Sequence, residues 1–145
     1  MAAHNWLEEL ERLARQAENS YWGFLGCKLV HAGEDEVIVA LDIKPHHLNL
    51  LGILHGGVHA ALLDSAMGLA AMTARRNANL VTSAMHIHYT APVTAQRVTA
   101  TAKVLHQSGR TVTTEGRLWS GEAGSGADDG VLCAITTASY RVAAP

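Results

Sequence analysis

The spacing of hydrophobic positions changes several times along the chain, and each change marks a structural element. Between residues 5 and 17 these positions recur on one face at helical spacing, which predicts an amphipathic helix of about four turns. Asn5 is the expected N-cap, and Glu8 stands three residues later, as in a reciprocal capping box. The apolar face consists of Leu7, Leu10, Leu13, Ala14 and Ala17. We expect this helix to pack across a sheet edge or groove.

Two strand-like segments follow, at residues 24–32 and 36–43. Ala-Gly-Glu-Asp between them predicts a hairpin turn. The second segment has a clean alternation of apolar positions, made by Val37, Val39, Leu41 and Ile43. A loop at residues 44–54 then leads to the next helix.

The most apolar segment begins at Gly56 and continues to about Arg75. Its alanine, leucine, valine and methionine residues lie nearly all round a helix, and a helix of that kind is buried. Its small residues, Gly68 among them, indicate close approach of another backbone. A helix from a second copy of the chain would fit there.

Beyond residues 75–77 the apolar spacing returns to period two, which predicts four more strands. In the first of these, which Pro92 interrupts, one face carries Met85, Ile87 and Tyr89 and the other carries Ala84, His86 and His88. The other three contain residues 98–104, 111–119 and 131–142, with Ser108-Gly109 as a turn between the first two of them. The Gly-, Ser- and Asp-rich residues 120–130 predict a mobile loop.

The predicted order is therefore a helix, two strands, one buried helix and four strands. Short turns join most strands, so the sheet is expected to be largely antiparallel. The economical architecture is one sheet of five or six strands wrapped round one central helix, in the α+β class. With no internal repeat or domain boundary, residues 1–145 form a single domain.

The composition limits the classes of partner and the cellular compartment that we expect for this protein. Hydrophobic residues at 48% and charged ones at 17% describe a compact globular protein, and a net charge of −2 argues against nucleic acid. Acidic residues near the N-terminus are wrong for a signal or transit peptide, and no uninterrupted apolar stretch is long enough to span a membrane. A cytoplasmic protein is expected. Cys27 and Cys133 are then expected to be buried free thiols, with a disulfide as the alternative.

Gly56 and Gly57 stand where the buried helix begins. The first N–H groups of a helix have no intrahelical acceptor and carry partial positive charge, and glycine lets another group come close. This favours a binding site for a carbonyl oxygen that becomes negatively charged during a reaction. Asp64 follows in apolar surroundings, either as a reactive carboxylate or as a buried group that bonds a neighbour.

Gly56 and Asp64 are eight residues apart on one helix, or about 12 Å. One carbonyl cannot touch both. If both act on the same substrate, one of them must come from another copy of the chain, most simply in a two-fold dimer with antiparallel helices.

The pattern Asn49-x-x-Gly52-x-x-His55-Gly56-Gly57 with Asp64, Thr82 and Ile87-x-Tyr89-x-x-Pro92 resembles the hotdog-fold acyl-CoA thioesterases of the PaaI type over nearly the whole chain. The resemblance implies hydrolysis of coenzyme A thioesters with a small aromatic or medium-chain acyl group. It also implies dimers with shared active sites, often paired into tetramers, and no metal or other cofactor.

By position, the resemblance assigns Gly56 N–H to the thioester oxygen and the partner's Asp64 to attack or water activation. Asn49 would position the water or carbonyl, and His55 would support the oxyanion side. Gly57 would contribute to substrate binding. Thr82 would lie near the carboxylate, although it alternates out of phase with Met85, so a bulge or a strand-end position has to be assumed. Ser83 is kept as the alternative.

Other interpretations remain open. A metal site could use His55 and His59, at i, i+4 spacing, or His86 and His88 on one strand face, but no zinc protease motif accompanies them. His46, His47, His86 and His88 are more often solvated or interface residues. For the coenzyme phosphates the cationic candidates are Arg75, Arg76, Lys103, Arg110 and Arg117. A hydratase or dehydratase acting on acyl thioesters and a non-catalytic acyl-CoA-binding module are the alternative functions.

Overall fold

A computed structural model describes residues 4–121 and 130–143. Residues 122–129, which make up most of the predicted loop, lie outside the described residues. The elements, in chain order, are α1 (His4–Gln16), the 3-10 turn η1 (Ala17–Asn19), α2 (Tyr21–Leu25), β1 (Cys27–Ala32), β2 (Val37–Asp42), the 3-10 turn η2 (Pro45–His47), α3 (Gly56–Ala74), β3 (Leu80–Tyr89), β4 (Arg97–Ser108), β5 (Thr111–Ser120) and β6 (Val131–Val142).

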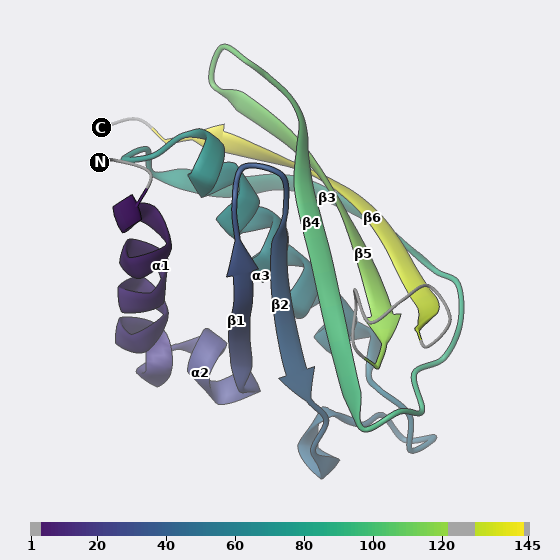
Figure 1. Cartoon of the computed structure of the whole chain (residues 1–145). Helices are drawn as coiled ribbons and strands as arrows, with labels where there is room; N and C mark the ends of the chain where they lie inside the picture. Colours follow the sequence, from purple (N-terminus) through teal and green to yellow (C-terminus); the bar gives the residue numbers. More distant parts are fainter. Residues whose placement is uncertain (1–3, 122–129, 144–145) are drawn as a thin grey trace.

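The described strands form one antiparallel six-stranded sheet in the order β1-β2-β4-β5-β6-β3. The sheet curves round α3, and α1 lies beside β1 (Figure 1). This confirms the predicted α+β class and the hotdog fold. Strand β3 follows α3 in the chain, and among the described strands it pairs only with β6, so it forms one edge of the sheet.

The first predicted strand, residues 24–32, begins later than expected. Its first residues belong to α2, which ends where Gly26 adopts a left-handed conformation with φ of 85°. The Gly26 N–H donates to the carbonyls of Trp22 and Gly23, so glycine closes this helix at its C-terminus. Strand β1 consequently starts only at Cys27.

Helix α1 begins one residue earlier than predicted and packs with a slightly different face. Since it starts at His4, Asn5 is its second residue rather than its N-cap. Leu10 is fully buried, but Leu7 is 39% exposed. Trp6 takes its place in the contact, because its indole Nε1–H donates to Thr73 Oγ1 on α3 at 3.0 Å.

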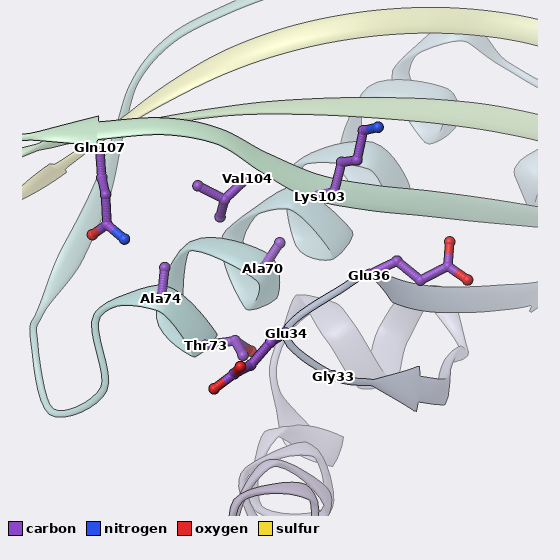
Figure 2. Close-up of a pocket in the computed structure, with 9 residues that line it drawn as sticks. All are labelled: Gly33, Glu34, Glu36, Ala70, Thr73, Ala74, Lys103, Val104 and Gln107. Carbon is purple, nitrogen blue, oxygen red and sulfur yellow. The ribbon is translucent and has the colours of Figure 1, made fainter.

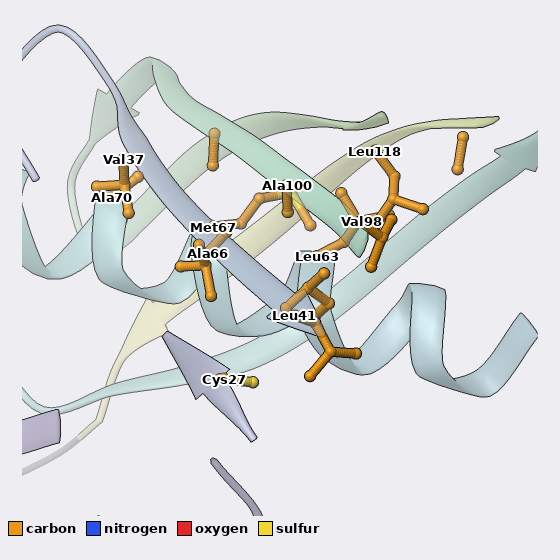
Figure 3. Packing of buried hydrophobic residues seen from close by; sticks show 14 of the residues in the cluster. Cys27, Val37, Leu41, Leu63, Ala66, Met67, Ala70, Val98, Ala100 and Leu118 are labelled. Atoms are coloured by element: carbon orange, nitrogen blue, oxygen red, sulfur yellow. The ribbon is translucent and has the colours of Figure 1, made fainter. Parts of the chain in front are cut away.

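The core lies between α3 and the concave face of the sheet. Leu63, Ala66, Met67 and Ala70 of α3 meet strand residues such as Val98 and Leu118 (Figure 3). Each fully buried large apolar side chain contributes about 1.5–3 kcal/mol. None of the helices in the described part of the chain has the length and apolar character needed to span a membrane.

Gly116 in the middle of β5 allows α3 to lie close to the sheet. A Cβ added there would meet Leu63 and Thr136 at 3.1 Å and Met67 at 3.2 Å. Such contacts are tighter than side chains normally make, so a larger residue would require these neighbouring side chains to shift by a few tenths of an ångström. The strand glycine thus leaves room for the side chains that pack α3 on the sheet.

The two cysteines are buried free thiols, as expected, and form no disulfide. Burial raises the pKa of Cys27 to about 11. Burial also raises the pKa of Cys133. Both thiols are therefore protonated and unreactive near neutral pH.

Candidate active site

The loop before α3 is folded by the side chain of Asn49. Its Oδ1 accepts from the N–H groups of Leu51 at 2.9 Å and Ile53 at 3.3 Å, and its own N–H donates to the Ile53 carbonyl. The acceptor of Asn49 is thus used within the loop, which leaves the side-chain amide N–H groups as donors for a ligand. Leu50 and Leu51, at the tip of this loop, are almost fully exposed.

His55 is the N-cap of α3. Its Nδ1 accepts from the Gly57 N–H at 2.8 Å, so the proton of the neutral ring lies on Nε2, which is a donor. A Cβ at Gly57 would lie 2.9 Å from this Nδ1, so a side chain there would displace the cap. The Gly57 N–H is therefore engaged, whereas the Gly56 N–H has no acceptor among the residues that the structure describes.

A groove of about 300 Å³ opens at this end of α3. Gly56 and His59 line it from the helix, and Tyr89 lines it from the end of β3. The Tyr89 hydroxyl donates to the Gly56 carbonyl at 2.8 Å, and a Cβ at Gly56 would lie 3.3 Å from that hydroxyl. The rest of the lining is mostly apolar: Ile53, Leu54, Thr90, Ala91 and Pro92.

Asp64 lies two turns further along α3, half-buried, with two hydroxyl groups on one of its oxygens. Thr82 Oγ1 donates to Oδ1 at 2.9 Å, and the Tyr140 hydroxyl lies 2.6 Å from the same atom. That hydroxyl is also 2.9 Å from the Asp64 backbone carbonyl. Since the Tyr140 hydroxyl has one proton, we assign its hydrogen bond to the closer acceptor, the carboxylate oxygen Oδ1 of Asp64. Oδ2 has no partner among the described residues and is available to a ligand.

A β-bulge explains why Thr82, rather than Ser83, meets the carboxylate. In the pairing of β3 with β6, Thr82 stands opposite Tyr140 and Ala84 opposite Ser139, so Ser83 is the extra residue. The bulge that Thr82 required is confirmed. The Ser83 hydroxyl instead donates to the Ser139 carbonyl at 3.3 Å, away from Asp64.

Tyr140 is 3% exposed, and it packs over Gly68 one turn after Asp64. Burial, with the adjacent Asp64 carboxylate as the second cause, raises the pKa of Tyr140 well above its ordinary value. The phenol therefore stays protonated near neutral pH and acts as a hydrogen-bond donor. The group beside Gly68 in the described chain is thus this aromatic ring, and close approach of a helix from a second copy stays a prediction.

The predicted site residues thus form two groups within one chain. One is the helix N-terminus with Asn49, His55, Gly56 and Gly57, and the other is Asp64 with Thr82. About 12 Å along α3 separate the oxyanion candidate from the carboxylate. A single chain does not bring them together.

The histidines do not gather into a metal site in the described part of the chain, where no three metal-ligating side chains converge. His59 Nδ1 is directed to the His55 carbonyl at 3.1 Å. His86 and His88 are exposed, and their Nε2 atoms lie 3.1 Å apart. The expectation for His47 was wrong: it is buried, with Nε2–H donating to the Leu25 carbonyl at 2.8 Å and Nδ1 accepting from Lys44 N–H.

The five cationic candidates for phosphate binding all have partners within the chain. Arg75 binds the side chain of Gln107 and the Gly109 carbonyl, and Arg76 lies 4.8 Å from the Trp6 ring centroid. Lys103 and Arg117 both pair with Glu115, and Arg110 donates to the Val142 carbonyl. These contacts leave the phosphate site unassigned.

A second hollow, also of about 300 Å³, lies near the other end of α3 (Figure 2). The β1–β2 turn, α3 and β4 line it, and its charged residues, Glu34, Glu36 and Lys103, are of both signs. It contains none of the glycine, histidine or carboxylate groups of the candidate site.

Three residues of the site were not predicted from the sequence: His59, Tyr89 and Tyr140. Tyr89 was noted only as part of the family motif. His59 was noted only as a possible metal ligand. Tyr140 is 76 residues from Asp64, and only the pairing of β3 with β6 brings it there. The alternation of the last strand contained a usable signal, since a large hydroxyl-bearing residue falls on its buried face.

Comparisons with known proteins identify the family of the chain. The family model for the thioesterase superfamily matches residues 51–127. Acyl-coenzyme A thioesterase 13 of Mus musculus is 36% identical over 80 residues, which are 54% of this chain and 57% of that protein. The chain thus matches little more than half the length of this curated relative.

Two solved structures extend the similarity. A mutant form of the phenylacetic acid degradation protein PaaI from Thermus thermophilus is 32% identical and covers 85% of this chain and 98% of its own, with a TM-score of 0.73. The BH2602 protein from Bacillus halodurans, solved with CoA, is 33% identical, covers 72% of this chain and 70% of its own, and has a TM-score of 0.65.

Proposed function

Because the chain belongs to the thioesterase superfamily, we propose that it hydrolyses acyl-CoA thioesters to a free acid and coenzyme A. The acyl group in this proposal is small and aromatic or of medium length. The similarity to an acyl-coenzyme A thioesterase and to a protein solved with CoA supports the substrate class. In this proposal the groups described above supply both a donor and a base, and no metal or other cofactor takes part.

The observation that carries the proposal is the carboxylate of Asp64, fixed by two hydroxyls through Oδ1 with Oδ2 left open. A carboxylate so oriented can take a proton from a water molecule that attacks the thioester carbon. The two hydrogen bonds fix the carboxylate and leave Oδ2 free for a water molecule. On this geometry we propose the role of general base for Asp64, with direct attack on the thioester as the alternative.

Gly56 N–H is the proposed donor to the oxygen of the tetrahedral intermediate, and His55 Nε2–H is proposed as a second donor. A preorganised donor of this kind is worth about 3–4 kcal/mol in the transition state. Asn49 holds the loop beside them and offers its amide N–H groups to the carbonyl or the water.

The two groups meet if the active species is a two-fold dimer, in which Asp64 of one copy faces Gly56 of the other. The unpaired side of β3 supports this arrangement, because an open sheet edge is a surface on which a second copy can pair. Val81, 52% exposed on this strand, would be covered in such a dimer. Dimers could pair further into a tetramer.

Thiol release from a panel of acyl-CoA thioesters tests the activity. We expect turnover by the wild type, its loss in Asp64→Asn, and its retention in Asp35→Asn, an exposed aspartate in the β1–β2 turn. Enoyl-CoA hydration, measured on the same sample, should be absent. Full thiol release by Asp64→Asn would refute the assignment.

A single turnover in ¹⁸O-labelled water tests the role of Asp64. If the carboxylate activates water, the acid released in the first turnover contains the label. If Asp64 attacks the thioester itself, coenzyme A leaves as the thiol and an anhydride forms. When water opens that anhydride at the aspartyl carbon, the first acid takes its oxygen from the side chain and the label enters the protein.

A further inference from the structure

His59 is a buried histidine in the wall of the groove, and the proposed hydrolysis leaves it without a role. Its side chain is on the first turn of α3, three residues after Gly56, and therefore on the same face of the helix. Only 3% of the residue is exposed. Its ring meets the edge of the Tyr89 ring, with centroids 5.2 Å apart and planes at 74°.

The hydrogen bond at Nδ1 fixes the tautomer of this ring. Nδ1 lies 3.1 Å from the His55 carbonyl oxygen, which can only accept, so Nδ1 holds the proton. In the neutral ring Nε2 is then an acceptor. Burial lowers the pKa of His59, and the positive end of the helix also disfavours a charged ring there, so the neutral form prevails near pH 7.

The acceptor atom of this ring is left without a partner. Nε2 has no hydrogen-bond partner among the described residues, and it is not one of the fully covered polar atoms there. His59 lines the groove, so the groove is the space open to this atom. Apart from this atom, the wall beside it is mostly apolar, with Ile53, Leu54, Ala91 and Pro92.

We propose that Nε2 of His59 is a substrate-binding acceptor, which receives a hydrogen bond from an O–H or N–H group of the ligand near its thioester. The inference rests on the proposed function for the identity of the ligand. A lone acceptor in an apolar wall binds a donor and disfavours a purely hydrocarbon group, because an unpaired buried lone pair is costly. The donor can be a hydroxyl on the acyl group or an amide of the coenzyme arm.

Two variants separate hydrogen bonding from packing. His59→Phe keeps a ring against Tyr89 and removes the acceptor, whereas His59→Gln places an amide oxygen near the position of Nε2. Both lack the Nδ1–H bond to the His55 carbonyl, so they are matched in that loss. Circular dichroism and thermal melts establish that each variant is folded.

The measurement is calorimetric binding of three ligands that cannot be hydrolysed. They are an aryl-alkyl thioether of coenzyme A, the same thioether with a hydroxyl on its ring, and coenzyme A itself. If the donor is an acyl hydroxyl, His59→Phe weakens only the hydroxylated thioether, by about threefold to tenfold. If the donor is on the coenzyme arm, it weakens all three ligands by the same factor. In both cases His59→Gln restores most of the affinity.

Unchanged affinities in His59→Phe would overturn the proposal, and so would an equal loss in His59→Phe and His59→Gln. Binding of the thioethers by the wild type without thiol release would refute the proposed hydrolysis and leave the role of His59 standing. Failure of the wild type to bind any coenzyme A ligand would overturn both.

Discussion

The Tyr140 hydroxyl lies 2.6 Å from Oδ1 of Asp64, across 76 residues of sequence. Thr82, opposite Tyr140 in the β3–β6 ladder, reaches the same oxygen from the neighbouring strand. Two donors from the sheet therefore hold a carboxylate on the central helix by one of its two oxygens. The reactive oxygen is positioned by the sheet although it belongs to the helix.

Removing either hydroxyl should weaken thiol release. A hydrogen bond to a charged group is worth about 1.5–3 kcal/mol, so Tyr140→Phe and Thr82→Val should each lower kcat by about tenfold or more. Because the two donors share one acceptor, the double variant should lose more than the sum of the single losses in free energy. Steady-state kinetics of the four proteins gives this coupling, and strict additivity would contradict a shared role.

The Gly56 N–H can be removed with little disturbance of the backbone. His55 is extended, with φ of −63° and ψ of 136°, and Gly56 is the first helical residue, where proline is tolerated. Gly56→Pro should lower kcat by about 10²–10³-fold, since it deletes the oxyanion donor.

Gly56→Ala is the control for this experiment. It keeps the N–H and adds a Cβ about where the proline has one, 3.3 Å from the Tyr89 hydroxyl. It should therefore retain far more activity than Gly56→Pro. Equal losses in the two variants would assign the effect to steric pressure on Tyr89 and refute the donor role.

A shared active site predicts rescue by mixing. In a dimer of one Asp64→Asn chain and one Gly56→Pro chain, one site has both defects and the other has neither. Unfolding and refolding an equal mixture should restore about a quarter of the wild-type activity, whereas each variant refolded alone stays inactive. No recovery in a mixture that size exclusion shows to be dimeric would mean that each chain acts alone.

Stability should fall as the solution is acidified below about pH 6.5. Burial lowers the pKa of His47 in the folded chain below the ordinary value near 6.5, so the unfolded chain binds its proton first. The contribution of His47 to the unfolding free energy is complete above pH 6.5. It is lost as the pH falls towards the pKa of His47 in the folded chain, by at most about 1.4 kcal/mol per pH unit. His59, whose pKa burial also lowers, adds to the same trend.

His47→Asn tests this assignment by urea unfolding between pH 8 and pH 5. The variant cannot titrate and leaves the Leu25 carbonyl unpaired, so it should be less stable at pH 8 by about 1–3 kcal/mol. Its unfolding free energy should also depend less on pH than that of the wild type. An unchanged pH dependence would show that other groups cause the loss.

In the folded protein, Cys27 and Cys133 should not react in a thiol assay. Both are buried, and burial raises the pKa of each, so a disulfide reagent should modify neither quickly in the folded protein. Two thiols per chain should react at once in denaturant. Rapid modification of the folded protein would contradict the packing around these residues.

The sequence predicted the elements of this fold well where periodicity alone determines them. The apolar positions of period two in β2, β4 and β5 and the all-round apolar character of α3 are local properties. The structure confirms strands and a buried helix at these places, and of the three strands β5 shows the regular alternation of burial. Boundaries set by single backbone conformations were less accessible. The left-handed Gly26 ends α2, and no hydrophobic pattern signals that conformation.

The residues of the candidate site also fall into two groups, those that local spacing reveals and those that it does not. His55 with Gly56 and Asp64 could be found because they lie close together in sequence on one helix. Tyr140, and the choice of Thr82 over Ser83, depend on how β3 pairs with β6. Pairing register is decided by contacts between segments far apart in the chain, so spacing along one strand cannot reveal it.

The extra residue in β3 also determines how this segment can vary. After Ser83, the residues that share the inner face of the strand are Met85 and Ile87. Before Ser83, the residue on that face is Thr82. Because Thr82 stands opposite Tyr140 and Ala84 opposite Ser139, deleting Ser83 would leave a regular ladder in which Thr82 still faces Asp64. We therefore expect the extra residue to be the position at which β3 can lose length without turning Thr82 away from the carboxylate.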